Sequence, residues 1–274
     1  MTPLIDSHVH VWDPAANDYG WLSGELDRAY LPDEYRAGAP HTTGVIFVEA
    51  NAADSVAEAG WVAGLSWPEL LGIVAHAPLE LGAAVSHHLD RLEESGRVVG
   101  IRRQLQDEPL GFFDHPGLLE GLRVLAAGGR PFDACVRHEQ LPALTDLLAR
   151  VPDLPVVLDH LGKPPVALGD DGTWARNLAA LAALPRVRVK LSGIAPEGSA
   201  DRAVREQARR WLAAALELFG PERCMLGSDW PVSAISPPRE TPGEWLEHVV
   251  SDLGASDGDR DWLTWRTASA FYGV

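Results

Sequence analysis

The sequence predicts a single-domain (β/α)8 TIM barrel that extends over residues 1–274. Eight short apolar segments with the character of buried strands alternate with helical segments along the chain. Alternating βα units imply parallel strands joined by right-handed crossovers, and eight such units suggest closure into a barrel. The competing fold, an open doubly wound sheet, is disfavoured because no glycine-rich phosphate-binding fingerprint follows any of the strands.

The first half of the chain supplies four of these units. Strands are expected at residues 5–12, 43–51, 71–76 and 97–103. Helices are expected from Asp54, a favourable N-cap residue, toward Leu65, and over residues 81–94 and 117–127. The stretch from Asp13 to His41 is rich in proline, glycine and aromatic residues, so we expect an irregular loop there that covers the functional end of the barrel.

The second half continues the same alternation. Strands are expected at residues 131–136, 154–160, 186–193 and 224–230. The helices between and after them are expected at residues 141–150, 174–184, 201–219, 242–253 and 259–271. The longest of these should end at Gly220-Pro221, a pair that stops a helix.

The charge and cysteine content narrow the class of protein. The chain has 23 lysines and arginines against 39 aspartates and glutamates, so its formal net charge is −16, which disfavours nucleic acid and anionic membranes as partners. No run of about 18 apolar residues is present that could span a bilayer, and no signal peptide is recognisable. Cys135 and Cys224 are too few for a disulfide framework, and we expect a cytoplasmic protein.

Polar residues stand where the expected strands end, which is the functional face of a (β/α)8 barrel. They are His8, His10, Glu49, His76, Arg102, Arg103, His160, Lys190, Ser192 and Asp229. These residues are far apart in the sequence and would converge in a closed barrel. The H-x-H spacing of His8 and His10 on a strand directs both imidazoles to one side, which indicates a metal site or an acid–base pair.

Several of these residues also have a purely structural interpretation. His76 could be a buried histidine without a catalytic role, Glu49 could cap the following helix, and Lys190 could extend outward to solvent. Arg102 and Arg103 alternate faces of their strand, so one of them should point into the barrel. A guanidinium in that place suits a carboxylate or an ester carbonyl.

Five short motifs carry a resemblance to a known family. They are D-S-H-V-H-V-W, G-I-R-R-Q, L-D-H-L-G-K-P, K-L-S-G and G-S-D-W-P, in this order at strand ends. Together they resemble the amidohydrolase-2 branch of the amidohydrolase superfamily, and more narrowly its lactonases of the L-fuconolactonase and L-rhamnonolactonase type. The resemblance covers the whole chain. It implies a barrel hydrolase with His8, His10 and Asp229 at its catalytic centre, acting on a small lactone derived from a sugar or an aromatic compound.

The resemblance leaves the metal content of this centre open. One divalent metal, with zinc as the expected ion, would be held by His8, His10 and Asp229, with His160 or Glu49 as a further ligand. Metal-dependent members add a histidine at the end of the fifth strand, whereas this strand ends D-A-C-V-R-H. Some lactonases of the group work without a metal, so a metal-independent centre is the alternative.

Lactone hydrolysis needs an activated water, a group that polarises the carbonyl, and a proton donor for the leaving alkoxide. We assign Asp229 as the general base, because an acid that ends the last apolar strand is costly to bury without such a setting. His160 is assigned as the polarising group or proton donor, and Arg102 as a stabiliser of the oxyanion. The residues expected to contact substrate are Arg103, Glu49, His76, Trp12 and Trp230.

Two rival functions follow from the same residues. A relative in the same family could be a metal-dependent decarboxylase or hydrolase of a small aromatic acid. A protein of a different class would be a catalytically inactive barrel that binds a small acid. Each version expects a small-molecule partner, and a homodimer is one option for the assembly.

Overall fold

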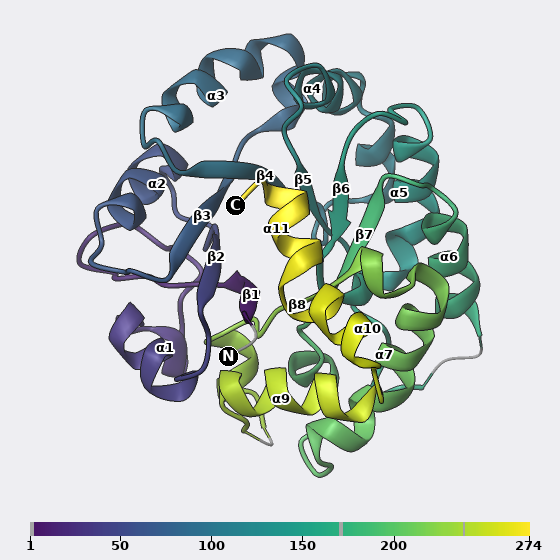
Figure 1. The fold of residues 1–274 in the computed structure, drawn as a ribbon. Helices are drawn as coiled ribbons and strands as arrows, with labels where there is room; N and C mark the ends of the chain where they lie inside the picture. The colour runs from purple at the N-terminus through teal and green to yellow at the C-terminus, as the bar shows by residue number, and fades with distance from the viewer. Residues whose placement is uncertain (1–2, 170–171, 238) are drawn as a thin grey trace.

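The computed structural model describes residues 3–169, 172–237 and 239–274. Its eight strands form one sheet in the order β1-β2-β3-β4-β5-β6-β7-β8, and each neighbouring pair is parallel (Figure 1). The sheet closes because Val9 bridges Trp230 in parallel, and the His10 N–H donates to the Trp230 carbonyl over 2.8 Å. The prediction of a single-domain (β/α)8 barrel is confirmed.

The strands lie within the predicted segments or one residue from them. They are β1 (Ile5–Val9), β2 (Gly44–Val48), β3 (Leu70–His76), β4 (Val98–Gln104), β5 (Phe132–Cys135), β6 (Val156–Leu158), β7 (Val187–Leu191) and β8 (Cys224–Leu226). Most of their residues are buried, as expected for a parallel sheet covered by helices.

The α-helices surround the sheet as the alternation predicts (Figure 1). They are α1 (Pro32–Gly38), α2 (Ser55–Ala63), α3 (Val85–Glu93), α4 (Pro116–Ala127), α5 (Leu141–Leu148), α6 (Thr173–Ala182), α7 (Val204–Phe219), α8 (Val232–Ile235), α9 (Pro242–Asp252), α10 (Asp257–Asp261) and α11 (Thr267–Tyr272). Asp54 caps α2 as predicted, since its carboxylate accepts from the N–H groups of Val56 and Ala57. None of the helices in the described ranges is long and apolar enough to cross a membrane.

The segment between β1 and β2 is more ordered than predicted. It contains a 3-10 turn, η1 (Gly24–Leu26), and α1, which begins with a proline at its first turn. The buried ring of Tyr35 anchors α1, and its hydroxyl donates to Asp6 over 2.9 Å. The expectation of an irregular loop from Asp13 to His41 is therefore corrected for these two elements, because packing against the barrel stabilises a helix that is short in sequence.

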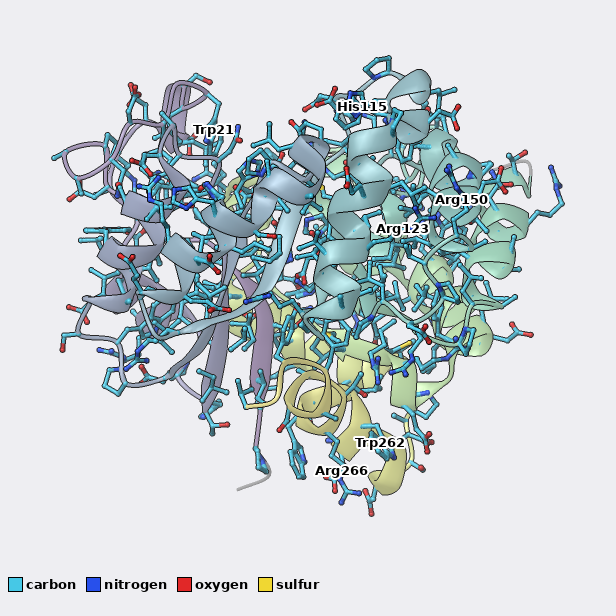
Figure 2. The ribbon with its side chains drawn as sticks, turned by 90° about the horizontal axis from the view of Figure 1, so that it is seen from above. Trp21, His115, Arg123, Arg150, Trp262 and Arg266 are labelled. Atoms are coloured by element: carbon cyan, nitrogen blue, oxygen red, sulfur yellow. The ribbon has the colours of Figure 1, made fainter. Side chains whose placement is uncertain are left out.

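The two ends of the barrel differ. Helix α11 lies across one end (Figure 1), where Phe271 packs on an interior layer that includes Ile46, Val157 and Met225. Trp262 lies at this same end, and Trp21 lies at the opposite end (Figure 2). The open end carries the carboxyl termini of the strands, so the fold leaves that end for the functional site.

Candidate active site

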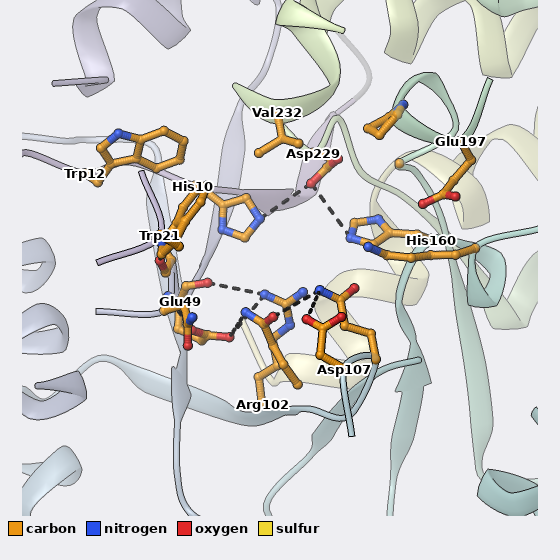
Figure 3. A pocket seen from close by; sticks show the side chains of 17 residues that line it. His10, Trp12, Trp21, Glu49, Arg102, Asp107, His160, Glu197, Asp229 and Val232 are labelled. Atoms are coloured by element: carbon orange, nitrogen blue, oxygen red, sulfur yellow. Dashed lines mark hydrogen bonds and ion pairs between the residues drawn. The ribbon is translucent and has the colours of Figure 1, made fainter. Parts of the chain in front are cut away.

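A cavity of about 290 Å³ opens where the strands end. Asp229 and His10 lie at its base, Trp12 and Trp21 line one side, and His160 lies opposite (Figure 3). This mixture of aromatic walls and a few convergent polar groups is typical of a small-molecule site.

His8, His10 and Asp229 form a compact group at the junction of the first and last strands. The Nε2 atoms of the two histidines lie 3.1 Å apart. Oδ1 of Asp229 lies 3.5 Å from Nε2 of His10 and 3.9 Å from Nε2 of His8. The Asp229 N–H donates to the His8 carbonyl over 2.8 Å, so the barrel closure itself positions this group.

His160 completes the cluster from the end of β6. Its Nε2 lies 3.8 Å from Oδ1 of Asp229, and its Nδ1 forms a hydrogen bond of 2.9 Å with the Ser192 hydroxyl. The backbone here is left-handed, with φ of 52° at His160. Gly193 permits the approach, because a Cβ at that position would lie 2.3 Å from the His160 ring.

A buried ionic network lies beneath the cluster. The Lys190 ammonium is fully buried and lies 2.5 Å from Asp133, 3.1 Å from Asp159 and 3.1 Å from Nδ1 of His8. Nδ1 of His8 also lies 3.3 Å from Asp159, and the Tyr272 hydroxyl donates to Asp133 over 2.8 Å. Lys190 therefore points into the barrel, and the alternative that it extends to solvent is excluded.

Arg102 links this network to the cavity wall. Its Nε lies 3.0 Å from Asp159, and one terminal nitrogen lies 3.2 Å from Glu49. The Gln104 amide also donates to Glu49 over 3.1 Å. The guanidinium and both carboxylates are almost completely buried, and the two acids compensate its charge.

Burial and charge set the protonation states of the centre. Burial alone would raise the pKa of Asp229, but the neighbouring His160, His10 and His8 outweigh it and hold that pKa below its usual value. Burial lowers the pKa of His160 to about 4. Burial, followed by the charge of Lys190, holds the pKa of His8 well below its usual value. Asp229 is thus a carboxylate at neutral pH, beside two neutral imidazoles.

Burial and nearby charges also shift the pKa values of the two acids beneath the centre, Asp159 and Asp133. Burial would raise the pKa of Asp159, but Lys190, His8 and Arg102 hold it well below the usual value. Burial raises the pKa of Asp133 to about 6 against the opposing charge of Lys190. The network therefore contains a permanent anion, Asp159, directly beneath His8.

The donor set fits one divalent cation. The ligand atoms of His8, His10 and Asp229 all lie within 4.8 Å of one another. Nδ1 of His10 lies 2.8 Å from the Val48 carbonyl, so this nitrogen carries the proton and Nε2 presents a lone pair. Two imidazoles and a carboxylate are a common three-ligand set for zinc. Glu49 is not part of this group, because it pairs with Arg102 on the cavity wall.

Arg103 does not line the cavity, which corrects its assignment as a substrate contact. Its guanidinium lies 3.0 Å from Glu80 and 2.6 Å from Glu108, on the outer side of the strand. Arg102 is the inward member of the pair, as the alternation of a strand requires.

His76 and Trp230 are also placed outside the cavity lining, in contrast to the prediction. Trp230 packs edge to face against Tyr30 and Tyr35, with ring centroids 5.5 and 5.6 Å away, so it supports the loop behind the site. His76 ends β3, where its carbonyl lies 3.3 Å from the His88 ring. Trp12 and Glu49 do line the cavity.

Asp133, Asp159 and Tyr272 belong to this centre but are absent from the predicted site residues. The two acids did carry a signal, because each interrupts an apolar strand segment and needs a buried partner. Tyr272 gave no such signal, since it belongs to a helix at the far end of the chain and meets Asp133 only in the folded barrel.

Comparison with known proteins identifies the family. The family model described as Amidohydrolase matches residues 5–274. A protein of Burkholderia multivorans named L-fucono-1,5-lactonase is 33% identical, and the alignment covers 94% of this chain and 92% of that protein. An L-rhamnono-gamma-lactonase of Scheffersomyces stipitis is 26% identical over 74% of this chain and 68% of its own length.

A solved structure agrees with these sequence matches. A crystal structure of an amidohydrolase from Burkholderia multivorans with bound zinc superimposes with a TM-score of 0.88 at 31% identity, covering 99% of each chain. The family match spans nearly the whole sequence, and the predicted resemblance is confirmed. The chain belongs to the amidohydrolase family.

Proposed function

We propose that this protein hydrolyses the ester bond of a small sugar lactone. The observation that carries the proposal is the Asp229 carboxylate, held within 3.5–3.9 Å of three imidazole nitrogens at the base of a cavity walled by tryptophan. The names of the Burkholderia and Scheffersomyces relatives support a deoxy-aldonolactone as substrate.

The cavity lining supports a neutral, hydroxyl-rich substrate. Arg102 is already compensated by Glu49 and Asp159, so it offers little net positive charge to an anionic substrate. The side-chain amides of Asn51, Gln104 and Gln106 line the cavity and can donate to or accept from hydroxyl groups. Trp12 and Trp21 offer apolar faces to a sugar ring.

In the proposed reaction, Asp229 takes a proton from water while the water oxygen bonds to the lactone carbonyl carbon. His160 donates through Nε2 to the carbonyl oxygen as negative charge develops there, and Ser192 holds the ring. The ring C–O bond then breaks, and the proton held by Asp229 passes to the leaving oxygen. The product is a hydroxy acid, which releases one proton to solvent at neutral pH.

The three-ligand group of His8, His10 and Asp229 is proposed to hold one divalent cation, with zinc the best match to two imidazoles and a carboxylate. When bound, such a cation supplies a Lewis acid at the base of the cavity.

The proposal includes a cytoplasmic location, which the two free buried cysteines support.

The test is a panel of aldono-1,4- and aldono-1,5-lactones, with turnover measured by proton release and metal content measured on the same sample. We expect turnover of six-carbon deoxy-aldonolactones. Release of CO2 from aromatic acids without lactone turnover would replace the proposal with a decarboxylase. Binding of hydroxy acids without any turnover would indicate an inactive barrel.

A further inference from the structure

The two ring nitrogens of His8 face different surroundings. Nε2 faces the cluster, where the Nε2 atom of His10 is 3.1 Å away. Nδ1 points down into the barrel, where the Lys190 ammonium lies at 3.1 Å and Oδ1 of Asp159 at 3.3 Å. An ammonium can only donate a hydrogen bond, and a carboxylate can only accept one. Nδ1 of His8 thus has one partner for each of its two protonation states.

On the Nε2 side of His8, the His10 ring limits where a proton can lie. Nδ1 of His10 lies 2.8 Å from the Val48 carbonyl, which only accepts. In neutral His10, therefore, Nδ1 carries the proton and Nε2 turns a lone pair toward His8. Two imidazole nitrogens 3.1 Å apart must share either a proton or a cation between them.

A shared proton and a shared cation require different tautomers of His8. With no cation, the proton sits on Nε2 of His8 and is donated to His10, so Nδ1 accepts a hydrogen bond from Lys190. With a cation bound, both Nε2 atoms offer lone pairs, so the proton sits on Nδ1 and is donated to Asp159. Neither tautomer leaves a buried nitrogen without a partner.

We propose that Lys190 and Asp159 act as a pair of positioning residues that accommodate both tautomers of His8, so that the centre can be assembled with or without a bound cation. Lys190 serves the cation-free form and Asp159 serves the cation-bound form. The inference concerns the protein without substrate and goes beyond the proposed lactonase activity.

The surroundings hold this pair in place. Lys190 is fully buried and lies 2.5 Å from Asp133, which in turn accepts from the Tyr272 hydroxyl. Asp159 is held on its other oxygen by Arg102, at 3.0 Å. Each member therefore keeps its position when the proton of His8 changes sides.

The direct test is 15N NMR of the histidine rings in the chelator-treated protein and after addition of zinc. We expect His8 to carry its proton on Nε2 without metal and on Nδ1 with zinc. A proton on Nδ1 in both states would overturn the proposal, because His8 would then offer Lys190 no lone pair in either state. Failure of zinc to bind the wild-type protein would overturn it equally.

Two variants should shift zinc binding in opposite directions. Asp159→Asn should weaken zinc binding by about 10–100-fold in calorimetry, because the anionic acceptor for Nδ1–H is lost. Lys190→Met removes the hydrogen-bond donor that serves the cation-free form, so it should tighten zinc binding on the order of tenfold. Weaker or unchanged zinc binding in Lys190→Met would contradict the proposal, and so would unchanged zinc binding in Asp159→Asn.

The matched control is Tyr272→Phe. It removes a hydrogen bond from the same network at Asp133, away from His8, and should leave the tautomer and the zinc affinity unchanged. A shift of the His8 tautomer in this control would contradict the specific roles of Lys190 and Asp159. All these readings are made without substrate, so absence of lactone turnover would count against the proposed function and not against this inference.

Discussion

The base and the rim of the cavity are built differently. At the base, His10 and Asp229 line the cavity and His8 lies directly beneath them; all three are at most 6% exposed, and each has contacts from more than one strand or loop. At the rim, Trp21 is 36% exposed, and the Asp107 side chain pairs at 3.1 Å with Arg137, and both of these side chains are largely exposed. The base is therefore fixed by the barrel, whereas the rim depends on loops.

This difference separates two tasks. A reaction that needs a carboxylate and three imidazole nitrogens in fixed positions benefits from strand ends, which move little. Recognition of one lactone among many depends on groups that can vary without disturbing the barrel. We expect substitutions at the base to change kcat or the stability of the fold, and substitutions at the rim to change mainly KM and product binding.

The strongest test at the base is Asp229→Asn. Loss of the proton acceptor should lower kcat for lactone hydrolysis by about 10²–10⁴-fold with the fold intact, as checked by circular dichroism. Ser233→Ala serves as the matched control, because it removes only the hydrogen bond of 2.7 Å to the other carboxylate oxygen. Near wild-type turnover in Asp229→Asn would refute the assignment of the general base.

The adjacent residues Arg102 and Arg103 allow the stability contributions of a buried and an outward-facing arginine to be compared. Arg102→Met leaves Glu49 and Asp159 buried without this cation, so we expect a loss of about 3–5 kcal/mol in the free energy of unfolding. Arg103→Met, on the outer face, should lose about 1 kcal/mol or less and keep its turnover. Urea denaturation of both variants measures the difference, and equal losses would contradict the separation of the two faces.

Glu58, which is buried behind the cavity wall, should make the stability of the fold depend on pH. Burial and the negative charge of Glu49 raise the pKa of Glu58 to about 8, above its ordinary value of 4.5. The folded state therefore binds a proton that the unfolded state releases between these pH values. The stability from this proton is fully present below about 4.5 and is lost as the pH rises through about 8.

Glu58→Gln, which resembles the protonated acid, should remove this dependence. The wild-type protein should lose stability relative to the variant by on the order of 3 kcal/mol between pH 5 and pH 9. The measurement is the thermal midpoint of both proteins at several pH values. A constant difference across that range would show that Glu58 is ionised in the folded protein throughout.

The same division explains what the sequence could predict. The eight strands and most helices followed from local alternation, and the polar strand ends pointed to His8, His10, His160 and Asp229, because a closed barrel must bring its strand ends together. Which of Arg102 and Arg103 faces inward depends on the register of β4 against its neighbours, for which two adjacent arginines give no local signal.

Partners from distant strands were harder to predict. Lys190 was recognised as a strand-end residue, but its contacts with Asp133 and Asp159 join three strands and depend on the closure of the sheet. Trp230 follows the last strand next to Asp229, yet the packing of Tyr30 and Tyr35 turns its ring away from the cavity. A residue adjacent to Asp229 in the sequence therefore need not line the same cavity.

The smallest expected effect lies at the rim, at Lys163. Lys163 lines the cavity, and its ammonium forms no ion pair with any residue that the structure describes. Its backbone is fixed in a left-handed turn, with its N–H donating to the His160 carbonyl over 2.8 Å. Ring opening converts a neutral lactone into a carboxylate, which this ammonium can attract.

Lys163→Met should therefore weaken inhibition by the hydroxy-acid product by about fivefold, equivalent to about 1 kcal/mol, while kcat changes little. Lys163→Arg should keep the inhibition, and Asp107→Asn should leave it equal or slightly stronger, because it removes a negative charge from the same rim. Product inhibition constants measured for the three variants check this. A large loss of kcat in Lys163→Met would instead indicate that Lys163 takes part in the reaction itself and not only in product binding at the rim.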